Sequence, residues 1–289
     1  MNRWKELDSL ESWMSQTEKQ QDDISERVLE KLPGGFILAE SFSSKLRDGK
    51  KLSLPCFYDE KHETPLILVP GGSFLYGLSS EQEESIQQLC TEEEWAMIHP
   101  LLQDAKPSIE IHLPPFLMSR FPVFNWVAEE NIDIDDSVER PDFSSDEGPF
   151  PCYLTSKEID LFLIKSGYRM PYDWEWEFVA KGVDDNLLIC GNEIPSERPL
   201  KEICITSFGN PKKNNKSSNG YGISGLAIAT LTSMDQEKSR VAVRGGAAGF
   251  YPFQAPGQWA MLLTSLRMPL ENMPGGVAGL RLCLDVPAI

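Results

Sequence analysis

The last third of the sequence constrains the fold most, because neither a helical nor a strand period persists beyond about residue 183. Eleven of the 21 glycines lie after position 200, 209–222 are rich in Asn, Ser and Lys, and the apolar runs are short. A helix bundle or a doubly wound parallel fold needs sustained periodicity along the whole chain. The sequence therefore predicts an α+β fold that is loop-rich, with short strands and few helices.

The N-terminal residues are predicted to be helical. Apolar side chains recur every three to four residues in two patches, at 4–14 and 24–32, which is the spacing of an amphipathic helix. The Pro-Gly-Gly sequence at 33–35 ends this pattern, since proline does not continue a helix and glycine supplies a turn. We expect an N-terminal helical segment over 1–32 and one domain over 33–289.

Short apolar runs bounded by turn residues predict the strands. Two of these runs flank a Pro-Pro pair and are expected to pair with each other. The expected strands are 36–39, 52–58 and 66–69, with the paired strands at 109–113 and 116–118.

Two further helices are indicated by their start signals. Ser80 and Glu83 have the spacing of a capping box and precede an apolar face that extends to Ile98. A second helix is expected to begin at Thr155-Ser156, with Glu158 in its first turn.

The charge balance excludes several classes of partner. Lys and Arg number 27 against 44 Asp and Glu, which gives a net charge of −17 and an isoelectric point near 4.6. Nucleic acids and anionic membranes need a basic face, so neither is expected as a partner. No apolar run approaches the ~20 residues of a membrane span, and the N-terminus lacks the apolar core of a signal peptide. A cytoplasmic protein is predicted, whose six scattered cysteines are free thiols.

No catalytic or metal-binding residue is predicted from short motifs. The sequence contains no nucleophile elbow, phosphate-binding loop or dinucleotide fingerprint. Its three histidines, His62, His99 and His112, are widely separated, and His112 alternates with apolar neighbours as an outward strand residue does. The acidic segment at 129–147 includes Asp133-x-Asp135-Asp136 but lacks the glycine and distal glutamate of a calcium loop. A solvated loop is expected there.

Seven short segments are informative as an ordered set. They are VPGGSFLYG at 69–77, LPPFLMSRFPV at 113–123, GYRMPYDWEWEFVAKG at 167–182, CGNE at 190–193, NGYGI at 219–223, VRGG at 243–246 and GLRL at 279–282. Together they resemble the formylglycine-generating enzyme (sulfatase-modifying factor) family, whose fold is a variant of the C-type lectin fold. The resemblance covers about 66–286 and implies that fold.

The same resemblance identifies a structural signature. In this family pattern, the two glutamates of the third segment tether neighbouring irregular loops through backbone N–H groups, which a loop-rich fold needs. The signature residues are Arg169, Pro171, Glu175, Trp176, Glu177, Arg244, Gly245, Gly246 and Arg281.

The family's catalytic residues have no counterpart here. Its aerobic members hold copper with two cysteines, a soft ligand pair suited to copper(I), and Trp259 and Thr264 occupy those positions. Its sulfoxide synthases use iron held by three histidines, for which no pattern is present. The stretch 224–233 also lacks the family's GNVWEW segment. The resemblance therefore implies a catalytically inactive domain with no cofactor, and a structural calcium ion is unsupported by the sequence.

We expect such a domain to act as a recognition module for a protein partner. The segment between Arg244 and Arg281 is rich in aromatic residues and poor in charge, and aromatic side chains anchor many interfaces. The same region contacts ligands in related lectin-fold receptors made by diversity-generating retroelements. The predicted partner-binding residues are Tyr251, Phe253, Trp259, Thr264 and Arg267.

One alternative to the binding hypothesis stays open at this stage. A metal-dependent oxidoreductase of the same family, acting on a cysteine or thiol substrate through a relocated copper or iron site, would contain stoichiometric metal. For the binding hypothesis, replacing both Phe253 and Trp259 by alanine is expected to remove binding while the fold persists. The sequence sets no oligomeric state.

Overall fold

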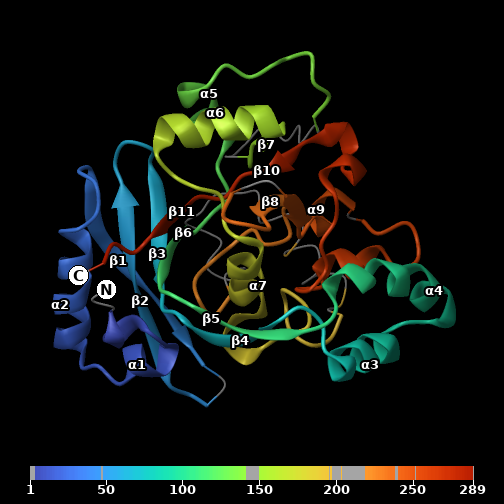
Figure 1. The fold of residues 1–289 in the computed structure, drawn as a ribbon, viewed down its shortest axis with the longest axis horizontal. Helices are drawn as coiled ribbons and strands as arrows, with labels where there is room; N and C mark the ends of the chain where they lie inside the picture. Colours follow the sequence, from blue (N-terminus) through green and yellow to red (C-terminus); the bar gives the residue numbers. More distant parts are fainter. Residues whose placement is uncertain are drawn as a thin grey trace.

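The computed structural model is an α+β fold with many loops and short strands, as the sequence predicts (Figure 1). It describes residues 4–46, 48–140, 150–194, 196, 203, 219–237, 240–250 and 252–288. No helix within these ranges is long and apolar enough to cross a bilayer. The five cysteines among them, Cys56, Cys90, Cys152, Cys190 and Cys283, are free thiols.

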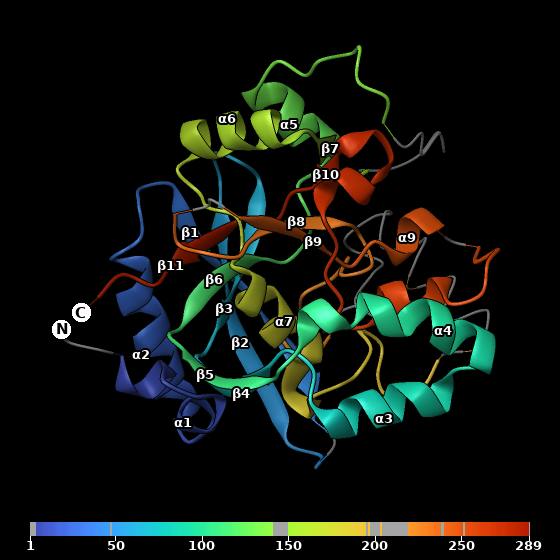
Figure 2. The same cartoon turned by 45° about the vertical axis from the view of Figure 1, so that its right-hand side comes forward.

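The main sheet has five antiparallel strands in the order β1-β2-β3-β6-β11. They are β1 (Phe36–Lys45), β2 (Lys51–Asp59), β3 (Thr64–Val69), β6 (Phe116–Ser119) and β11 (Cys283–Asp285). The sheet thus joins the first third of the chain to its last few residues. Trp4 Nε1 donates to Pro287 O at 2.7 Å, and the two ends of the chain lie side by side in both views (Figures 1 and 2).

β1 is the long outer strand of this sheet. Its register against β2 shifts between Ala39 and Phe42, so that Glu40 and Ser41 together oppose Pro55. Proline has no N–H to give to the ladder, which explains a bulge at this position. Residues 37–41 are all exposed.

Two smaller sheets complete the β structure. β7 (Tyr153–Leu154), β10 (Ala278–Gly279), β8 (Thr230–Ser233) and β9 (Val241–Arg244) form one sheet in that order, and β4 (Gly72–Tyr76) pairs with β5 (Ile109–Leu113). The predicted pairing of 109–113 with 116–118 is therefore wrong. The two prolines between β5 and β6 direct them into different sheets, where each finds a partner distant in sequence.

The N-terminal helical segment contains three short pieces that pack on the main sheet. They are a 3-10 turn (Lys5–Leu7), α1 (Leu10–Met14) and α2 (Glu18–Leu29). The helix expected over 1–32 is interrupted because Thr17 begins α2 with a capping box to Gln20. Trp13 is buried and its indole N–H donates to Ser53 O on β2 at 2.8 Å.

The single helix predicted to start at Ser80 is divided into two helices, α3 (Ser80–Leu89) and α4 (Glu92–Leu101). The expected Ser80–Glu83 capping box is displaced by one residue, because Ser79 and Gln82 form it. Ser79 is the half-buried residue directly after buried Leu78, so tertiary packing places the start there. A second capping box, from Thr91 to Glu94, begins α4.

The remaining helices surround or enter the core. α5 (Asn125–Asn131) and α6 (Ser156–Ser166) cover one end of the molecule, and α6 begins at the predicted Thr155–Glu158 capping box. α7 (Asp173–Lys181) lies between the main sheet and the α3–α4 pair in both views (Figures 1 and 2). The last part of the chain contains α9 (Ala247–Phe250) and 3-10 turns at Gln258–Leu262, Leu270–Asn272 and Pro274–Gly276.

Candidate functional site

Helix α7 carries ionisable side chains into the protein interior. Asp173, Glu175, Glu177 and Lys181 are each at most 4% exposed. Buried charges are tolerated only when they are paired and hydrogen-bonded. Their partners therefore show which parts of the chain this helix holds together.

Asp173 binds the buried Arg244 at the end of β9. Arg244 Nε donates to Oδ1 at 2.6 Å, and Nη2 donates to Oδ2. The same carboxylate accepts hydrogen bonds from Tyr76 Oη at 2.6 Å and Thr232 Oγ1 at 3.0 Å. Burial by itself would raise the pKa of Asp173, but Arg244 holds it at about 2. The ion pair joins α7 to β9, and the hydrogen bond from Tyr76 joins α7 to β4.

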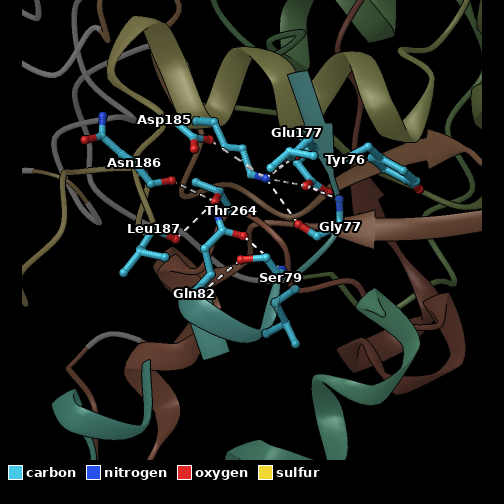
Figure 3. Close-up of polar contacts among 12 residues, drawn as sticks. Tyr76, Gly77, Ser79, Gln82, Glu177, Asp185, Asn186, Leu187 and Thr264 are labelled. Atoms are coloured by element: carbon cyan, nitrogen blue, oxygen red, sulfur yellow. Dashed lines mark hydrogen bonds and ion pairs between the residues drawn. The ribbon is translucent and has the colours of Figure 1, made fainter. Parts of the chain in front are cut away.

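Glu177 and Lys181 fix the chain after β4, and Figure 3 shows Glu177 beside Gly77. Gly77 N donates to Glu177 Oε1 at 2.7 Å, while Arg244 Nη2 donates to Oε2 at 2.8 Å. Lys181 Nζ pairs with Glu177 at 3.1 Å and donates to Gly77 O at 3.2 Å. This is the tether to a backbone N–H that the family resemblance implies for Glu177.

A second pair connects α7 to the closing strand. Arg169 donates to both carboxylate oxygens of Glu175 at 2.7 Å and to Asp285 at 2.6 Å. Glu175 also accepts from its own N-cap, Tyr172 N, at 2.9 Å. Burial raises the pKa of Glu175, and Arg169 opposes that rise. Glu175 therefore fixes the start of α7 rather than a distant loop.

The other signature residues also occupy framework positions. Arg281 donates to Ser119 O and Ser224 O at 2.7 and 2.6 Å, and burial lowers its pKa to about 10. The Trp176 ring lies 5.7 Å from the Arg244 guanidinium. Gly245 has a φ of +69°, and Pro171 O accepts from Ser233 N at 3.0 Å. Gly246 likewise has a positive φ, of +103°.

The partner-binding residues that the structure describes do not form an exposed surface together, since Trp259 and Thr264 are buried. Trp259 is 5% exposed and its indole N–H donates to Glu94 Oε1 on α4 at 2.9 Å. Thr264 is buried, and its hydroxyl donates to Asn186 O and Leu187 O at 3.0 and 3.1 Å (Figure 3). Phe253 is half-buried, whereas Tyr251 lies outside the described residues.

This burial changes how the binding hypothesis can be tested. Because Trp259 packs under α4, the double alanine variant at Phe253 and Trp259 is expected to lose stability as well as any contact. The role of these residues in binding stays a prediction. Arg267, whose side chain is 11% exposed, is considered separately below.

The histidines lie apart from one another. His62 is buried, with Nδ1 2.6 Å from Asp59 Oδ2, while His99 and His112 are exposed. Within the described ranges, no three His, Cys, Asp or Glu side chains are placed to hold one metal ion. The relocated metal site stays a prediction.

The acidic segment 129–147 begins in the last residues of α5, at 129–131, so the predicted loop is wrong there; 132–140 form turns and irregular structure, and 141–149 lie outside the described residues. Asp135 accepts from Ser137 N at 2.9 Å, and Arg140 pairs with Glu158 at 2.6 Å. Asp133 precedes this turn and Asp136 lies within it. Among the described residues, no three acidic side chains here are placed to hold a calcium ion.

A groove beside β1 is the feature that the sequence did not indicate. It has a volume of about 720 Å³, and eight consecutive residues, 39–46, line it. The rest of the lining comes from β2, β3 and later segments: Cys56, Pro65, Arg120, Val183, Asp184, Asn219 and Gly220. Ser44 Oγ donates to Gly220 O at 3.0 Å, which joins the two sides at one end. The sequence signal was available, because 36–44 contain one charged residue and no proline.

The outer edge of β1 has unused ladder positions. In an antiparallel pair, hydrogen-bonded residues alternate with residues whose backbone groups face away. Leu46 N donates to Lys50 O, so the alternation directs the N–H and C=O groups of Ser43 and Lys45 away from β2. No strand among the described residues pairs with this outer edge.

Comparisons with known proteins give a likeness of fold alone. No protein-family model matches the chain, and no curated protein matches its sequence. Among solved structures, PvdO from Pseudomonas aeruginosa is similar, with a TM-score of 0.48 and 15% sequence identity. That similarity covers 80% of this chain and 97% of PvdO.

Proposed function

We propose that this protein is a recognition module, and that an extended segment of a protein partner adds to the outer edge of β1. The observation that carries the proposal is the unpaired outer edge of β1 among the described strands, together with the groove that seven consecutive β1 residues, 39–45, help to line. Recognition rather than catalysis also agrees with Trp259 and Thr264 at the family's two cysteine positions.

The chemistry of the groove suits an extended backbone. A strand that adds to a sheet edge gains affinity from main-chain hydrogen bonds and specificity from alternate side chains. The outward groups of Ser43 and Lys45 supply such donors and acceptors. Ser41, Ser43 and Ser44 are among the residues that line the groove, so polar contacts to a peptide are available there.

The exposure of β1 supports the same role. Ile37 and Leu38, on opposite faces of the strand, are 44% and 37% exposed. Proteins usually protect a long edge strand with proline, lysine, a bulge or a covering segment, because an open edge pairs with other chains. Here the bulge at Glu40–Ser41 divides the edge, and the first lysine is Lys45 at its end.

The test is selection of binders from a random peptide display library by the full chain, followed by affinity measurement with two variants. Ser43→Pro removes the outward N–H without removing a bond to β2, and proline is accepted on edge strands. Ser43→Ala is the matched control, since it keeps that N–H. We expect peptides selected by the wild type to bind Ser43→Ala equally and Ser43→Pro at least about tenfold more weakly, as loss of one or two hydrogen bonds implies.

Two outcomes would overturn the proposal. One is that the selected peptides bind Ser43→Pro as tightly as they bind the wild type. The other is dimerisation of the wild type in sedimentation that Ser43→Pro abolishes, which would assign the edge to a second copy of this chain.

A further inference from the structure

Arg267 is a nearly buried arginine that lacks hydrogen-bond acceptors. Its side chain is 11% exposed, and Nε has no partner. Across the described residues, its one carboxylate neighbour is Asp173, whose Oδ2 lies 3.7 Å from Nε. A buried N–H without an acceptor is costly, and Nε is in that state among the described residues.

Asp173 does not supply the missing acceptor, because other donors already use it. Arg244 binds both of its carboxylate oxygens, and Tyr76 Oη and Thr232 Oγ1 each donate a further hydrogen bond. Arg267 therefore lies beside a satisfied ion pair, beyond hydrogen-bond distance.

The charged side chains around Arg267 indicate the sign of the ligand that this region would attract. The cluster contains three cations, Arg244, Arg267 and Lys181, against two carboxylates, Asp173 and Glu177. Asp185 lies 4.0 Å from Lys181, but it is 61% exposed and screened by water. A buried excess of positive charge in a chain of net charge −17 attracts a negative ligand.

The Arg267 side chain is also held in place. Its guanidinium lies over the Tyr76 ring, 4.9 Å from the centroid, while the Tyr76 hydroxyl is anchored on Asp173. Stacking on an aromatic face fixes the plane of a guanidinium and leaves its edge available for a fork of two parallel hydrogen bonds. Carboxylates and phosphates fit such a fork.

We propose that Arg267 is the anchor of a binding site for a small oxyanion, a carboxylate or a phosphate group, presented at the surface beside Tyr76. Tyr76 acts as the positioning residue that holds the guanidinium. The site is separate from the β1 groove, so the two proposals succeed or fail independently.

The test titrates inorganic phosphate and acetate, in separate experiments at constant ionic strength, into the full chain by calorimetry. Arg267→Gln removes the charge, and Arg240→Gln is the matched control, since the Arg240 side chain is 71% exposed on an outer turn. We expect saturable binding of at least one anion by the wild type and by Arg240→Gln, and at least tenfold weaker binding by Arg267→Gln. The anion that binds tighter identifies the ligand as carboxylate or phosphate.

A second measurement separates a ligand site from a structural role. Arg267 makes no hydrogen bond to Asp173, but its charge and its stacking on Tyr76 favour the folded state slightly, so Arg267→Gln is expected to lower the unfolding temperature by no more than about 4 °C in anion-free buffer. A larger loss of stability without anion would show that Arg267 mainly supports the fold. Absence of saturable binding of both anions, or equal binding by Arg267→Gln, would overturn the site.

Discussion

The buried ion pair between α7 and β9 makes the most quantitative prediction, which concerns Asp173→Asn. The side chains of Asp173 and Arg244 are both 0% exposed. Removing one partner of a buried ion pair leaves the other charge uncompensated, at a cost of about 3–5 kcal/mol. Asparagine has nearly the same shape and leaves no cavity, but its N–H₂ replaces an oxygen that accepts from Arg244. The loss therefore reports the ion pair together with its hydrogen bonds.

The pH dependence gives a second measure of the same pair. The pKa of Asp173 is lowered from 3.8 to about 2. At 1.36 kcal/mol per pKa unit, the ionised form contributes roughly 2 kcal/mol to stability. That contribution is complete above pH 3.8 and is lost as the pH falls from 3.8 towards 2. Asp173→Asn should lack this part of the acid destabilisation.

Urea unfolding followed by tryptophan fluorescence measures both effects. Asp185→Asn is the matched control at the other end of the helix, where the carboxylate is 61% exposed and 4.0 Å from Lys181. The control is expected to change the free energy of unfolding by less than about 0.5 kcal/mol. If Asp173→Asn stays within about 1 kcal/mol of the wild type at neutral pH, the assignment of this pair as a stabilising link is wrong.

Two further stability predictions follow from burial and backbone geometry. Trp259→Ala should lower the free energy of unfolding by about 3–5 kcal/mol, because it leaves a cavity. Trp259→Phe should lower it by about 1–3 kcal/mol, because it loses the hydrogen bond to Glu94. Equal losses in urea unfolding would contradict this division. Gly245→Ala should cost about 2 kcal/mol or more, because φ is +69° and the added Cβ would lie 2.3 Å from Leu226 O. Gly249→Ala is its control, with no atom within 4 Å of the new Cβ, and a thermal midpoint as low as that of Gly245→Ala would refute the argument.

Features specified by neighbouring residues could be predicted from the sequence. The capping box from Thr155 to Glu158 lies within four residues, and α6 begins there. The start of α3 shows the limit of this reasoning. Ser79 with Gln82 and Ser80 with Glu83 satisfy the same local pattern, and burial of Leu78 selects the first.

Features that depend on distant residues could not be predicted. Trp259 is buried because Glu94 on α4, 165 positions earlier, accepts its indole hydrogen bond. The groove beside β1 needs Asn219 and Gly220 to approach the strand from far along the chain. The lack of acceptors at Arg267 became visible only when every donor to Asp173 had been placed.

The order of strands in the main sheet has a consequence for the synthesis of this protein. β11 is synthesised long after β6, the strand with which it pairs. The indole N–H of Trp4 likewise donates to the carbonyl of Pro287, 283 positions later. During translation the edge of β6 and the indole of Trp4 therefore emerge long before their partners exist. Contacts of such separation form slowly, and open strand edges promote aggregation in the meantime. A nascent chain that still lacks β11 is therefore expected to be a target for chaperones.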